Sequence, residues 1–372
     1  MKETALPRRE QKTGAVFSPQ EAEFAAALLA RVPEPLLAWY DQNARVLPWR
    51  SDPTPYRVWI SEIMLQQTRV EAARGYFERF VEALPDAFAL AAVEEDALLK
   101  LWEGLGYYSR ARNLKHAAQI VVERFGGRLP ADFSALRKLP GIGEYSAGSI
   151  GSIAFGLRVP AVDGNVLRVV SRLLASRADV TLPTVKRELT ALVTGMLPEA
   201  RVGDFNQSLM ELGAVTCLPN GAPLCLLCPL SGLCEGFRTG AAPSLPVKTA
   251  KRPRRVQQIT VFLLTRKGSL YLRRRPASGL LAGLWELPNT EGALSRKQAD
   301  EFLDRLGIAH APAAEVGTGH HIFTHVEWRM ALYSCELRPG ASVPEGWVPV
   351  SPEDLTGRYP LPSAFLALLK NL

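Results

Sequence analysis

Four cysteines stand close together in the second half of the sequence, at Cys217, Cys225, Cys228 and Cys234. The two residues between Cys225 and Cys228 allow both thiolates to reach one metal centre, and the outer pair can complete a set of four ligands. Glycine and proline residues within the segment suit a loop that wraps around such a centre. The spacing predicts metal coordination, and it fits both a structural zinc ion and an iron–sulfur cluster. Cys335 stands alone and is expected to be a small buried residue.

Two carboxylates occur where an acid could take part in catalysis. Glu62 lies among Ile60, Ile63 and Met64, so it either faces solvent from a helix or sits in an apolar pocket. In a pocket, desolvation would raise its pKa and keep it protonated as a general acid. Asp163 precedes a helical run at residues 164–169 and is first of all expected to cap that helix. The residues alone leave the structural and the catalytic interpretations open.

A glycine-rich turn containing Gly141 and Gly143 lies within residues 139–148, between two segments of helical character. Glycines permit a tight turn, and the free N–H groups at the start of the following helix can bind a phosphate. Contacts of that kind position a protein on DNA without recognising its sequence. Many pairs of helices are joined by similar turns, so the turn alone does not indicate nucleic acid.

The elements that would position these residues fall into two regions. Helical periodicity predicts an all-α domain over residues 20–235, after a polar extension at 1–19, with helices at 21–31, 56–84, 88–102 and 110–125. Residues 257–372 are expected to form an α+β domain, with strands at 259–265, 269–273, 322–326, 328–337 and 347–349 and helices at 297–306 and 362–369. Residues 236–256, rich in proline, glycine and alanine, end in a basic run. They are expected to be a linker, either a solvated tether or a strap that binds phosphate.

The composition excludes several classes of protein. The chain has 372 residues, 47% hydrophobic and 22% charged, which is typical of a soluble protein of two or three domains. The uncharged run at 212–234 contains three prolines and the N-terminus lacks an apolar segment, so neither a membrane span nor a signal peptide is expected. Five cysteines are too few for a disulfide framework. The net charge of +7 favours an anionic partner, and a cytoplasmic location is expected.

Taken in order, the motifs resemble those of the helix–hairpin–helix DNA glycosylases over about residues 30–235. The segments that carry the resemblance are Leu47-Pro48-Trp49-Arg50, Glu62 with Leu65-Gln66-Gln67-Thr68, Leu105-Gly106-Tyr107-Tyr108-Ser109-Arg110, the glycine turn, Val162-Asp163-Gly164-Asn165-Val166 and the four cysteines. The surroundings of Glu62 and the Gly-Tyr-Tyr motif resemble in particular the adenine DNA glycosylases of the MutY type. The C-terminal half resembles the Nudix-related recognition domain of that family. The resemblance implies a helix–hairpin–helix motif at about 133–156 and a monomeric, nucleoid-associated enzyme of base excision repair.

The resemblance also implies a reaction. Adenine mispaired with 8-oxoguanine or guanine in double-stranded DNA would be flipped out and excised. Glu62 would protonate the adenine, Asp163 would stabilise the oxocarbenium-like sugar, and Asn165 would support Asp163. Tyr145 occupies the position where the related endonuclease III enzymes have a lysine that forms a Schiff base. A phenol cannot form that imine, so we expect a monofunctional glycosylase that leaves an abasic site.

Further site residues follow from the same resemblance. Those expected to contact DNA are Gln67, Tyr107, Gly141, Gly143 and Arg110, of which Gln67 and Tyr107 would fill and wedge the duplex. Those expected at the adenine pocket are Trp49, Arg50 and Glu211. The four cysteines would hold a [4Fe–4S] cluster. Their first interval is seven residues, where the family usually has six, and the extra residue is expected to bulge outward.

The C-terminal domain is expected to bind rather than hydrolyse. Residues 283–288 resemble the opening of a Nudix domain, but residues 291–306 lack the glutamate pairs that would hold catalytic magnesium. Phe323, Thr324 and His325 resemble the Phe-Ser-His loop of the family, and the Thr324 hydroxyl would accept from the N7–H of 8-oxoguanine. A strand end on a hairpin is the structural alternative. The competing functions are a pyrimidine-lesion glycosylase of the same superfamily, a non-catalytic DNA clamp and a Nudix pyrophosphohydrolase.

Overall fold

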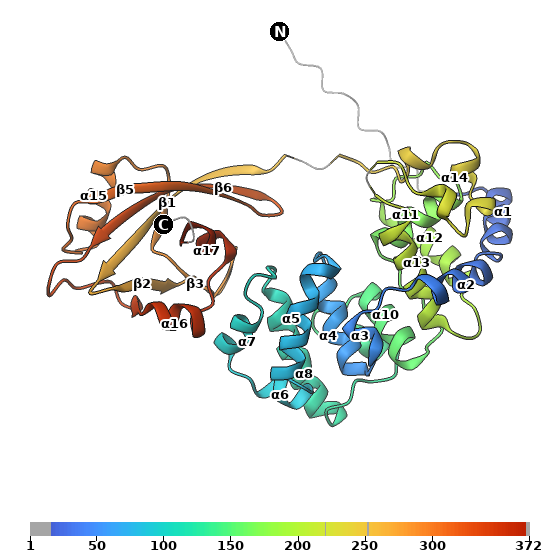
Figure 1. Ribbon diagram of the computed structural model, residues 1–372, viewed down its shortest axis with the longest axis horizontal. Helices are drawn as coiled ribbons and strands as arrows, with labels where there is room; N and C mark the ends of the chain where they lie inside the picture. Colours follow the sequence, from blue (N-terminus) through green and yellow to red (C-terminus); the bar gives the residue numbers. More distant parts are fainter. Residues whose placement is uncertain (1–15, 220, 251–252, 370–372) are drawn as a thin grey trace, which may run out of the picture. The chain divides into compact units, whose positions relative to one another are not determined.

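The structure is a computed structural model that describes residues 16–219, 221–250 and 253–369. The described residues form two compact units. The first unit takes the chain up to Glu62 and then Pro130–Ala250, and the second takes Ile63–Leu129 and the residues from 253 onward. The predicted all-α region therefore contributes to both units, and the sheet of the C-terminal region belongs to the second (Figure 1).

The first unit is helical. Its elements are α1 (Pro19–Leu29), α2 (Pro33–Asn43), α3 (Pro48–Ser51), most of α4 (Pro55–Leu65), α9 (Phe133–Arg137), α10 (Glu144–Phe155), α11 (Gly164–Leu173), α12 (Pro183–Gly195), α13 (Val202–Val215), α14 (Glu235–Arg238) and three 3-10 turns, η1 (Cys225–Leu227), η2 (Ser231–Leu233) and η3 (Ala242–Ser244). Polar side chains start several of these helices: Ser18 and Glu21 form a capping box on α1, and Asp132 caps α9. The apolar faces of α1, α2, α11, α12 and α13 share one core, which fixes α11 and α13 beside each other.

Residues 63–129 of the second unit form four helices after the end of α4: α5 (Val70–Ala83), α6 (Ala87–Ala92), α7 (Glu95–Leu101) and α8 (Ser109–Phe125). Two of the helices that the periodicity predicted are divided. The single helix expected at 56–84 is wrong, because the chain breaks between α4 and α5, where Gln67 has a left-handed φ of 59°. The helix expected at 88–102 is also two helices, since α6 ends at Ala92 and α7 starts after Glu94. The end of α8 is as predicted, with Gly126 in the left-handed conformation.

The remainder of the second unit is built on a seven-stranded sheet. Its strands are β1 (Arg255–Arg266), β2 (Ser269–Arg274), β3 (Trp285–Glu286), β4 (Asn289–Glu291), β5 (Ala314–Ile322), β6 (Val326–Glu336) and β7 (Val348–Val350). They lie in the order β3-β2-β1-β6-β5, with β4 on β1 and β7 on β2. β1 and β6 are parallel from the pair Arg255–Val326 to the pair Thr265–Glu336, and the other pairs are antiparallel.

Helices cover both faces of this sheet. Val261 and Leu263 of β1 face Phe365 of α17 (Ser363–Leu369), and the alternate residues Phe262 and Leu264 face the side of α15 (Arg296–Arg305). A further short helix is α16 (Pro352–Gly357). No helix among the described residues is long and apolar enough to cross a membrane.

The strand predicted at 322–326 is wrong, since residues 323–325 are the turn between β5 and β6. β5 was not predicted, because its sequence contains Gly317, Gly319 and two histidines and lacks the apolar alternation of a strand. Gly319 serves a close approach, since a Cβ there would lie 2.3 Å from Leu368 of α17. The hairpin of β1 and β2, the strands β6 and β7 and the helices α15 and α17 are where the sequence predicts them.

Candidate active site

Glu62 is a buried carboxylic acid on α4. Its exposed fraction is 6%, and its Oε2 has no hydrogen-bond partner among the described residues. Burial raises its pKa to about 7; the nearby hydroxyls of Tyr145 and Ser149 lower the pKa, and the charge of Asp163 raises it further. Glu62 therefore lies in a pocket and does not face solvent. With a pKa of about 7, a large share of the protein molecules carry a protonated Glu62 near neutral pH.

Asp163 is both a helix cap and a neighbour of that acid. Its Oδ1 accepts from the N–H groups of Asn165 and Val166 at 2.8 Å each, and its Oδ2 accepts from Asn165 Nδ2 at 2.7 Å. Burial raises the pKa of Asp163, while these hydrogen bonds oppose the shift by favouring the carboxylate. Arg168 Nη2 donates to Asn165 Oδ1 at 2.8 Å, so Asn165 is itself held in place. The expectation that Asn165 supports Asp163 agrees with this geometry.

Tyr145 lies on the first turn of α10 and faces both carboxyls. Burial raises its pKa well above the ordinary value, and the charges of Glu62 and Asp163 raise it further. Its hydroxyl contacts Met210 Sδ at 3.1 Å. The backbone of α10 directly contacts the backbone of the segment before Asp163. A Cβ on Gly148 would lie only 1.9 Å from the carbonyl oxygen of Pro160, so only glycine fits at this contact. Glu62, Tyr145 and Asp163 are thus brought together by α4, α10 and the N-terminus of α11.

A buried amide on α13, not predicted from the sequence, fixes the segment that leads to Asp163. Asn206 is fully buried, and its Oδ1 accepts from Ala161 N at 3.1 Å. Its Nδ2 donates to Val159 O at 2.9 Å and to Ser152 Oγ of α10 at 2.8 Å. Ser149, close to Glu62, was missed as well. Polar residues within otherwise apolar helices were the available signal for both.

An ion-pair network stands beside the acid. Glu211 is 1% exposed, and its carboxylate accepts from Arg45 Nε at 2.6 Å and from Arg50 Nη2 at 2.9 Å. Burial would raise the pKa of Glu211, but the hydrogen bonds from Arg45 and Arg50 bring it below the ordinary value. Arg50 also donates to Gln207 Oε1 at 3.0 Å, and its charge acts on Glu62. Trp49 is buried next to Arg50 in the chain. The network keeps Glu211 ionised, so Glu62 is the acid that retains the proton.

Arg110 requires a correction. It was expected to contact DNA, but it is 7% exposed and its guanidinium is occupied by protein oxygens. It donates to the carbonyls of Ile63, Met64, Gln66, Leu105 and Gly106 and to Thr68 Oγ1, at 2.6–3.2 Å. These oxygens belong to the two turns that carry Gln67 and Tyr107, whose φ angles are 59° and 47°. Arg110 therefore supports two strained turns from inside and is not available to a phosphate.

The two residues on those turns remain accessible. Gln67 is exposed, and the side chain of Tyr107 is 45% exposed. The Tyr107 hydroxyl is 2.7 Å from Thr324 Oγ1, so within the second unit the expected wedge touches the expected recognition residue. Phe323, Thr324 and His325 form the turn between β5 and β6, called the recognition turn below, in which Thr324 and His325 are exposed. The Phe323 ring packs edge-on against Trp328 with centroids 5.0 Å apart.

The glycine turn lies between α9 and α10 as predicted. Gly141 has a φ of 79°, which a side chain would disfavour, and Gly143 is the residue before α10. Both glycines are exposed, and no side chain caps the N-terminus of α10. The N–H groups at this end of α10 are thus oriented as a phosphate site requires.

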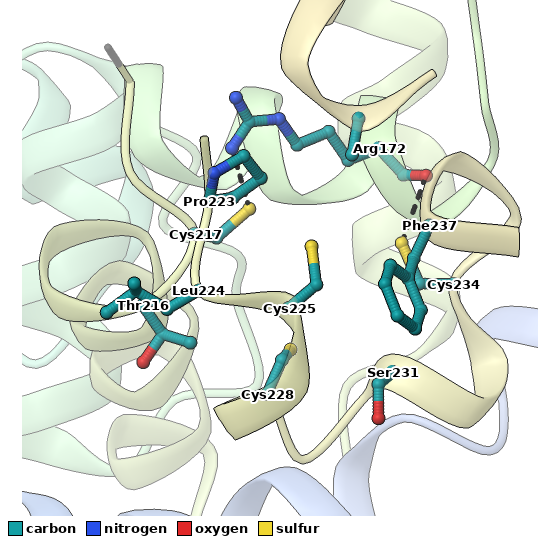
Figure 2. A pocket seen from close by; sticks show the side chains of 11 residues that line it. Arg172, Thr216, Cys217, Pro223, Leu224, Cys225, Cys228, Ser231, Cys234 and Phe237 are labelled. Carbon is teal, nitrogen blue, oxygen red and sulfur yellow. Dashed lines mark hydrogen bonds between the residues drawn. The ribbon is translucent and has the colours of Figure 1, made fainter. Parts of the chain in front are cut away.

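The four cysteines surround one pocket. Figure 2 shows their side chains at its wall, together with the guanidinium of Arg172. The pocket is partly open to solvent. Arg172 Nη1 donates to Cys217 Sγ at 3.2 Å, and Cys234 Sγ donates to Arg172 O at 3.4 Å. No three Cys, His, Asp or Glu side chains among the described residues are close enough to hold a single metal ion.

Comparison with known families defines the class. Residues 60–194 match the HhH-GPD superfamily of base excision DNA repair proteins, and residues 260–371 match the NUDIX domain. The chain is thus a helix–hairpin–helix DNA repair protein with a C-terminal Nudix-like domain.

Individual relatives define the family within that class. The adenine DNA glycosylase of Mus musculus is 35% identical over 92% of this chain and 78% of the mouse protein. The adenine DNA glycosylase of Homo sapiens is 36% identical over 84% of this chain and 68% of the human protein. A solved thermostable thymine-DNA glycosylase is 25% identical, covers 59% of this chain and 98% of its own, and has a TM-score of 0.49. The chain belongs to the adenine DNA glycosylase family.

Proposed function

We propose that this protein excises adenine from double-stranded DNA where the adenine is opposite 8-oxoguanine or guanine, by hydrolysing the bond between adenine and deoxyribose. The observation that carries the proposal is the pairing of the protonated acid Glu62 with the hydrogen-bonded carboxylate Asp163. A buried acid beside a carboxyl whose hydrogen bonds favour its charged form is what an acid-assisted glycosidic cleavage requires. A protein that only binds DNA would gain nothing from a buried, unsatisfied acid.

The acid and the carboxylate have separate tasks. Adenine is a poor leaving group, and a proton from Glu62 to a ring nitrogen lets it depart as a neutral base. General acids of this kind contribute about 10²–10⁴-fold to the rate. The cleavage leaves positive charge on the sugar, which Asp163 stabilises because Asn165 and Val166 hold its oxygens in place. Water then completes the hydrolysis. Because adenine in the duplex is stacked, it must first be flipped out of the helix.

The reaction is proposed to stop at the abasic site. The residue that faces both carboxyls from α10 is Tyr145, and its phenol has a raised pKa. A neutral phenol cannot attack the sugar to form an imine. Reduction with borohydride should therefore trap no covalent protein–DNA adduct, and efficient trapping would contradict the monofunctional assignment.

Recognition of the opposite base is assigned to the recognition turn. Thr324 carries an exposed hydroxyl that can accept from the N7–H which 8-oxoguanine has and guanine lacks. The contact between Tyr107 and Thr324 supports this assignment, because a wedge residue and a base-reading residue act on the same lesion pair. A double variant, Thr324→Ala with His325→Ala, that keeps the full preference for 8-oxoguanine over guanine would exclude it.

A [4Fe–4S] cluster is proposed as the cofactor of the cysteine pocket. The donor set fits, since four cysteines line one space and a buried guanidinium can balance the negative charge of a thiolate-bound cluster. When bound, the group would cross-link a segment with little regular structure. A brown protein with iron and sulfide would support the cluster, and a colourless, iron-free, active one would refute it.

The decisive experiment measures adenine release from duplexes with adenine opposite 8-oxoguanine, under single-turnover conditions. Thymine and uracil duplexes, assayed alongside, distinguish an adenine glycosylase from a pyrimidine glycosylase. Glu62→Gln keeps the shape of the side chain and removes its proton, so release should fall by about 10²–10⁴-fold. Glu123→Gln, an exposed residue of α8, is the matched control and should retain the wild-type rate. Release of thymine or uracil in preference to adenine would overturn the proposal, as would full activity in Glu62→Gln.

We also propose that the enzyme works as a monomer in the cytoplasm, in association with the nucleoid. The substrate itself, genomic DNA, is the reason for that location.

A further inference from the structure

Within the second unit, two charged residues at the end of α7 bind main-chain atoms of the C-terminal region. Lys100 Nζ donates to Leu355 O at 3.1 Å and to Tyr359 O at 3.4 Å. It also donates to Glu103 Oε2 at 2.7 Å, so all three of its N–H groups can be satisfied. The other oxygen of the carboxylate, Glu103 Oε1, accepts from Leu361 N at 2.7 Å. Lys100 and Glu103, called the docking pair below, therefore join α7 to the chain at the end of α16 and before α17.

The docking pair is largely shielded from water. The side chains of Lys100 and Glu103 are 18% and 16% exposed, and Leu361 is fully buried. A hydrogen bond from a buried N–H to a charged group is worth more than an exposed ion pair, and loss of its acceptor leaves the N–H unpaired. The pair therefore holds the docked segment more firmly than a surface ion pair would.

A second attachment lies at the other end of α7. Trp285 Nε1 donates to Asp96 Oδ2 at 3.3 Å, and the guanidinium of Arg274 donates to Asp96 Oδ1. The Trp285 ring packs edge-on against Tyr359 with centroids 4.9 Å apart, next to the segment that the docking pair binds. The sheet region is thus attached to both ends of α7.

The docking pair connects the two turns that are assigned to the lesion pair. Glu103 is four residues before Tyr107, the expected wedge, in the segment that follows α7. Leu361, which Glu103 binds, belongs to the core against which Phe323 of the recognition turn packs. One carboxylate is therefore linked to the wedge through four residues of chain and to the recognition turn through one core.

We propose that Glu103 is a positioning residue for recognition of 8-oxoguanine: by binding Leu361 N, it holds the sheet that carries the recognition turn against the helices that carry Tyr107. The inference rests on the proposed function of the recognition turn. The direct contact between Tyr107 and Thr324 joins exposed side chains, and it must open when both residues turn to DNA. The docking pair lies away from these tips, so it keeps the two turns in place after that contact is lost. Such preorganisation lowers the cost of ordering the turn on the base.

The experiment compares single-turnover excision at A opposite 8-oxoguanine with excision at A opposite G. Glu103→Ala removes the acceptor of Leu361 N. We expect the preference for 8-oxoguanine to fall about two- to tenfold, because a displaced turn loses the hydrogen bond from Thr324 to the base. The rate at A opposite G should be almost unchanged, because Arg110 supports the wedge turn without the docking pair.

A second variant tests the same attachment from the other side of the pair. Lys100→Met keeps the aliphatic stem of the side chain and removes the donors to Leu355 O and Tyr359 O, so it should cause the same selective loss. If Glu103→Ala does not fold, Lys100→Met carries the test. Glu123→Ala, a change of an exposed glutamate of α8, is the matched control and should keep the full preference.

A combined variant shows whether Glu103 acts through the recognition turn. Once Thr324→Val has removed the hydroxyl, Glu103→Ala should reduce the preference little further, since both changes remove the same contact to the base. Losses that multiply would mean that Glu103 acts by another route, and they would overturn the inference.

Hydrogen exchange at the Leu361 amide reports on the docking pair without any measurement of activity. In Glu103→Ala this amide should exchange faster than in the wild type. A freed amide with an unchanged preference would overturn the inference and leave the proposed function standing, and so would an amide that stays protected. If the rates at both duplexes fall together, Glu103 acts only on stability and the inference is wrong. A wild-type enzyme without any preference for 8-oxoguanine would refute the proposed role of the recognition turn, and this inference with it.

Discussion

The two regions to which chemistry is assigned are built in opposite ways. The reacting carboxyls are buried, and the backbone and side chains of α10, α11 and α13 hold the groups around them. The recognition turn is exposed, and the only side-chain hydrogen bond described for Thr324 joins it to Tyr107. The pocket is therefore organised by folding itself, whereas the turn relies on its attachments at either end.

This difference separates rate from selectivity. Changes in the pocket should act on the rate at every duplex and on the stability of the fold. Changes at the recognition turn should leave both almost untouched and alter only the choice of opposite base.

The largest effect is expected at Glu62, where activity and stability should change in opposite directions. The pKa of Glu62 is raised to about 7 in the folded protein, so its contribution to stability is complete below its unfolded pKa and is lost as pH rises through 7. Glu62→Gln, besides losing activity, should therefore be more stable than wild type at pH 8, by about 1–3 kcal/mol. Urea unfolding at pH 8 and at pH 4.5 measures this. Equal gains at both pH values would mean that the acid is not desolvated.

The pH dependence of the chemical step is the next largest effect. Glu62 must be protonated to act, so the single-turnover rate should fall about tenfold per pH unit above 7, and about 100-fold by pH 9. In Glu62→Gln the residual rate should lose this limb. A wild-type rate that stays flat from pH 7 to pH 9 would show that another group supplies the proton.

Substitution of Arg110 is expected to have an intermediate effect, and it tests whether this buried side chain stabilises the turns that carry Gln67 and Tyr107. Lysine has three donors and cannot satisfy the six oxygens that the guanidinium contacts. Arg110→Lys should lower the free energy of unfolding by about 2–4 kcal/mol and slow excision at both duplexes equally. Arg124→Lys, at the exposed end of α8, should do neither. Wild-type stability in Arg110→Lys would restore the discarded view of Arg110 as a DNA contact.

The smallest effect belongs to the recognition turn. Thr324→Val keeps the shape of the side chain and removes the hydroxyl, which should reduce the preference for 8-oxoguanine by about two- to tenfold, the value of one hydrogen bond. Thr318→Val, on β5 away from the turn, is the matched control. The melting temperature should not move. A fall in the rate at A opposite G would show that the turn also serves the catalytic step.

Local signals in the sequence were enough for much of the fold. The end of α8 at the left-handed Gly126 and the continuous apolar run of β1 both depend on residues within the element or directly beside it. The candidate site was predictable because its motifs occur in a recognisable order. Asp163 shows the limit of single residues, since it is the helix cap that the sequence suggested and also a neighbour of Glu62.

What could not be predicted depends on partners far away in the chain. The break after α4 is held by Arg110, more than forty residues later, so the periodicity around Gln67 gives no sign of it. The guanidinium of Arg110, which the resemblance assigned to DNA, instead donates to carbonyl oxygens that only the folded chain brings near. The sequence around Asn206 does not show that its amide bonds the segment before Asp163, because that contact forms only in the folded chain.

The contact of Gly148 with Pro160 has a consequence for how this enzyme could diversify. With a prospective Cβ only 1.9 Å from a carbonyl oxygen, the two segments touch through main chain, and no rotamer can adjust the gap. The spacing between the tyrosine and the aspartate is thereby inherited with the backbone. Substitutions elsewhere in the lining of the site can change which base it accepts, while the relative positions of Tyr145 and Asp163 stay the same in each variant of the enzyme.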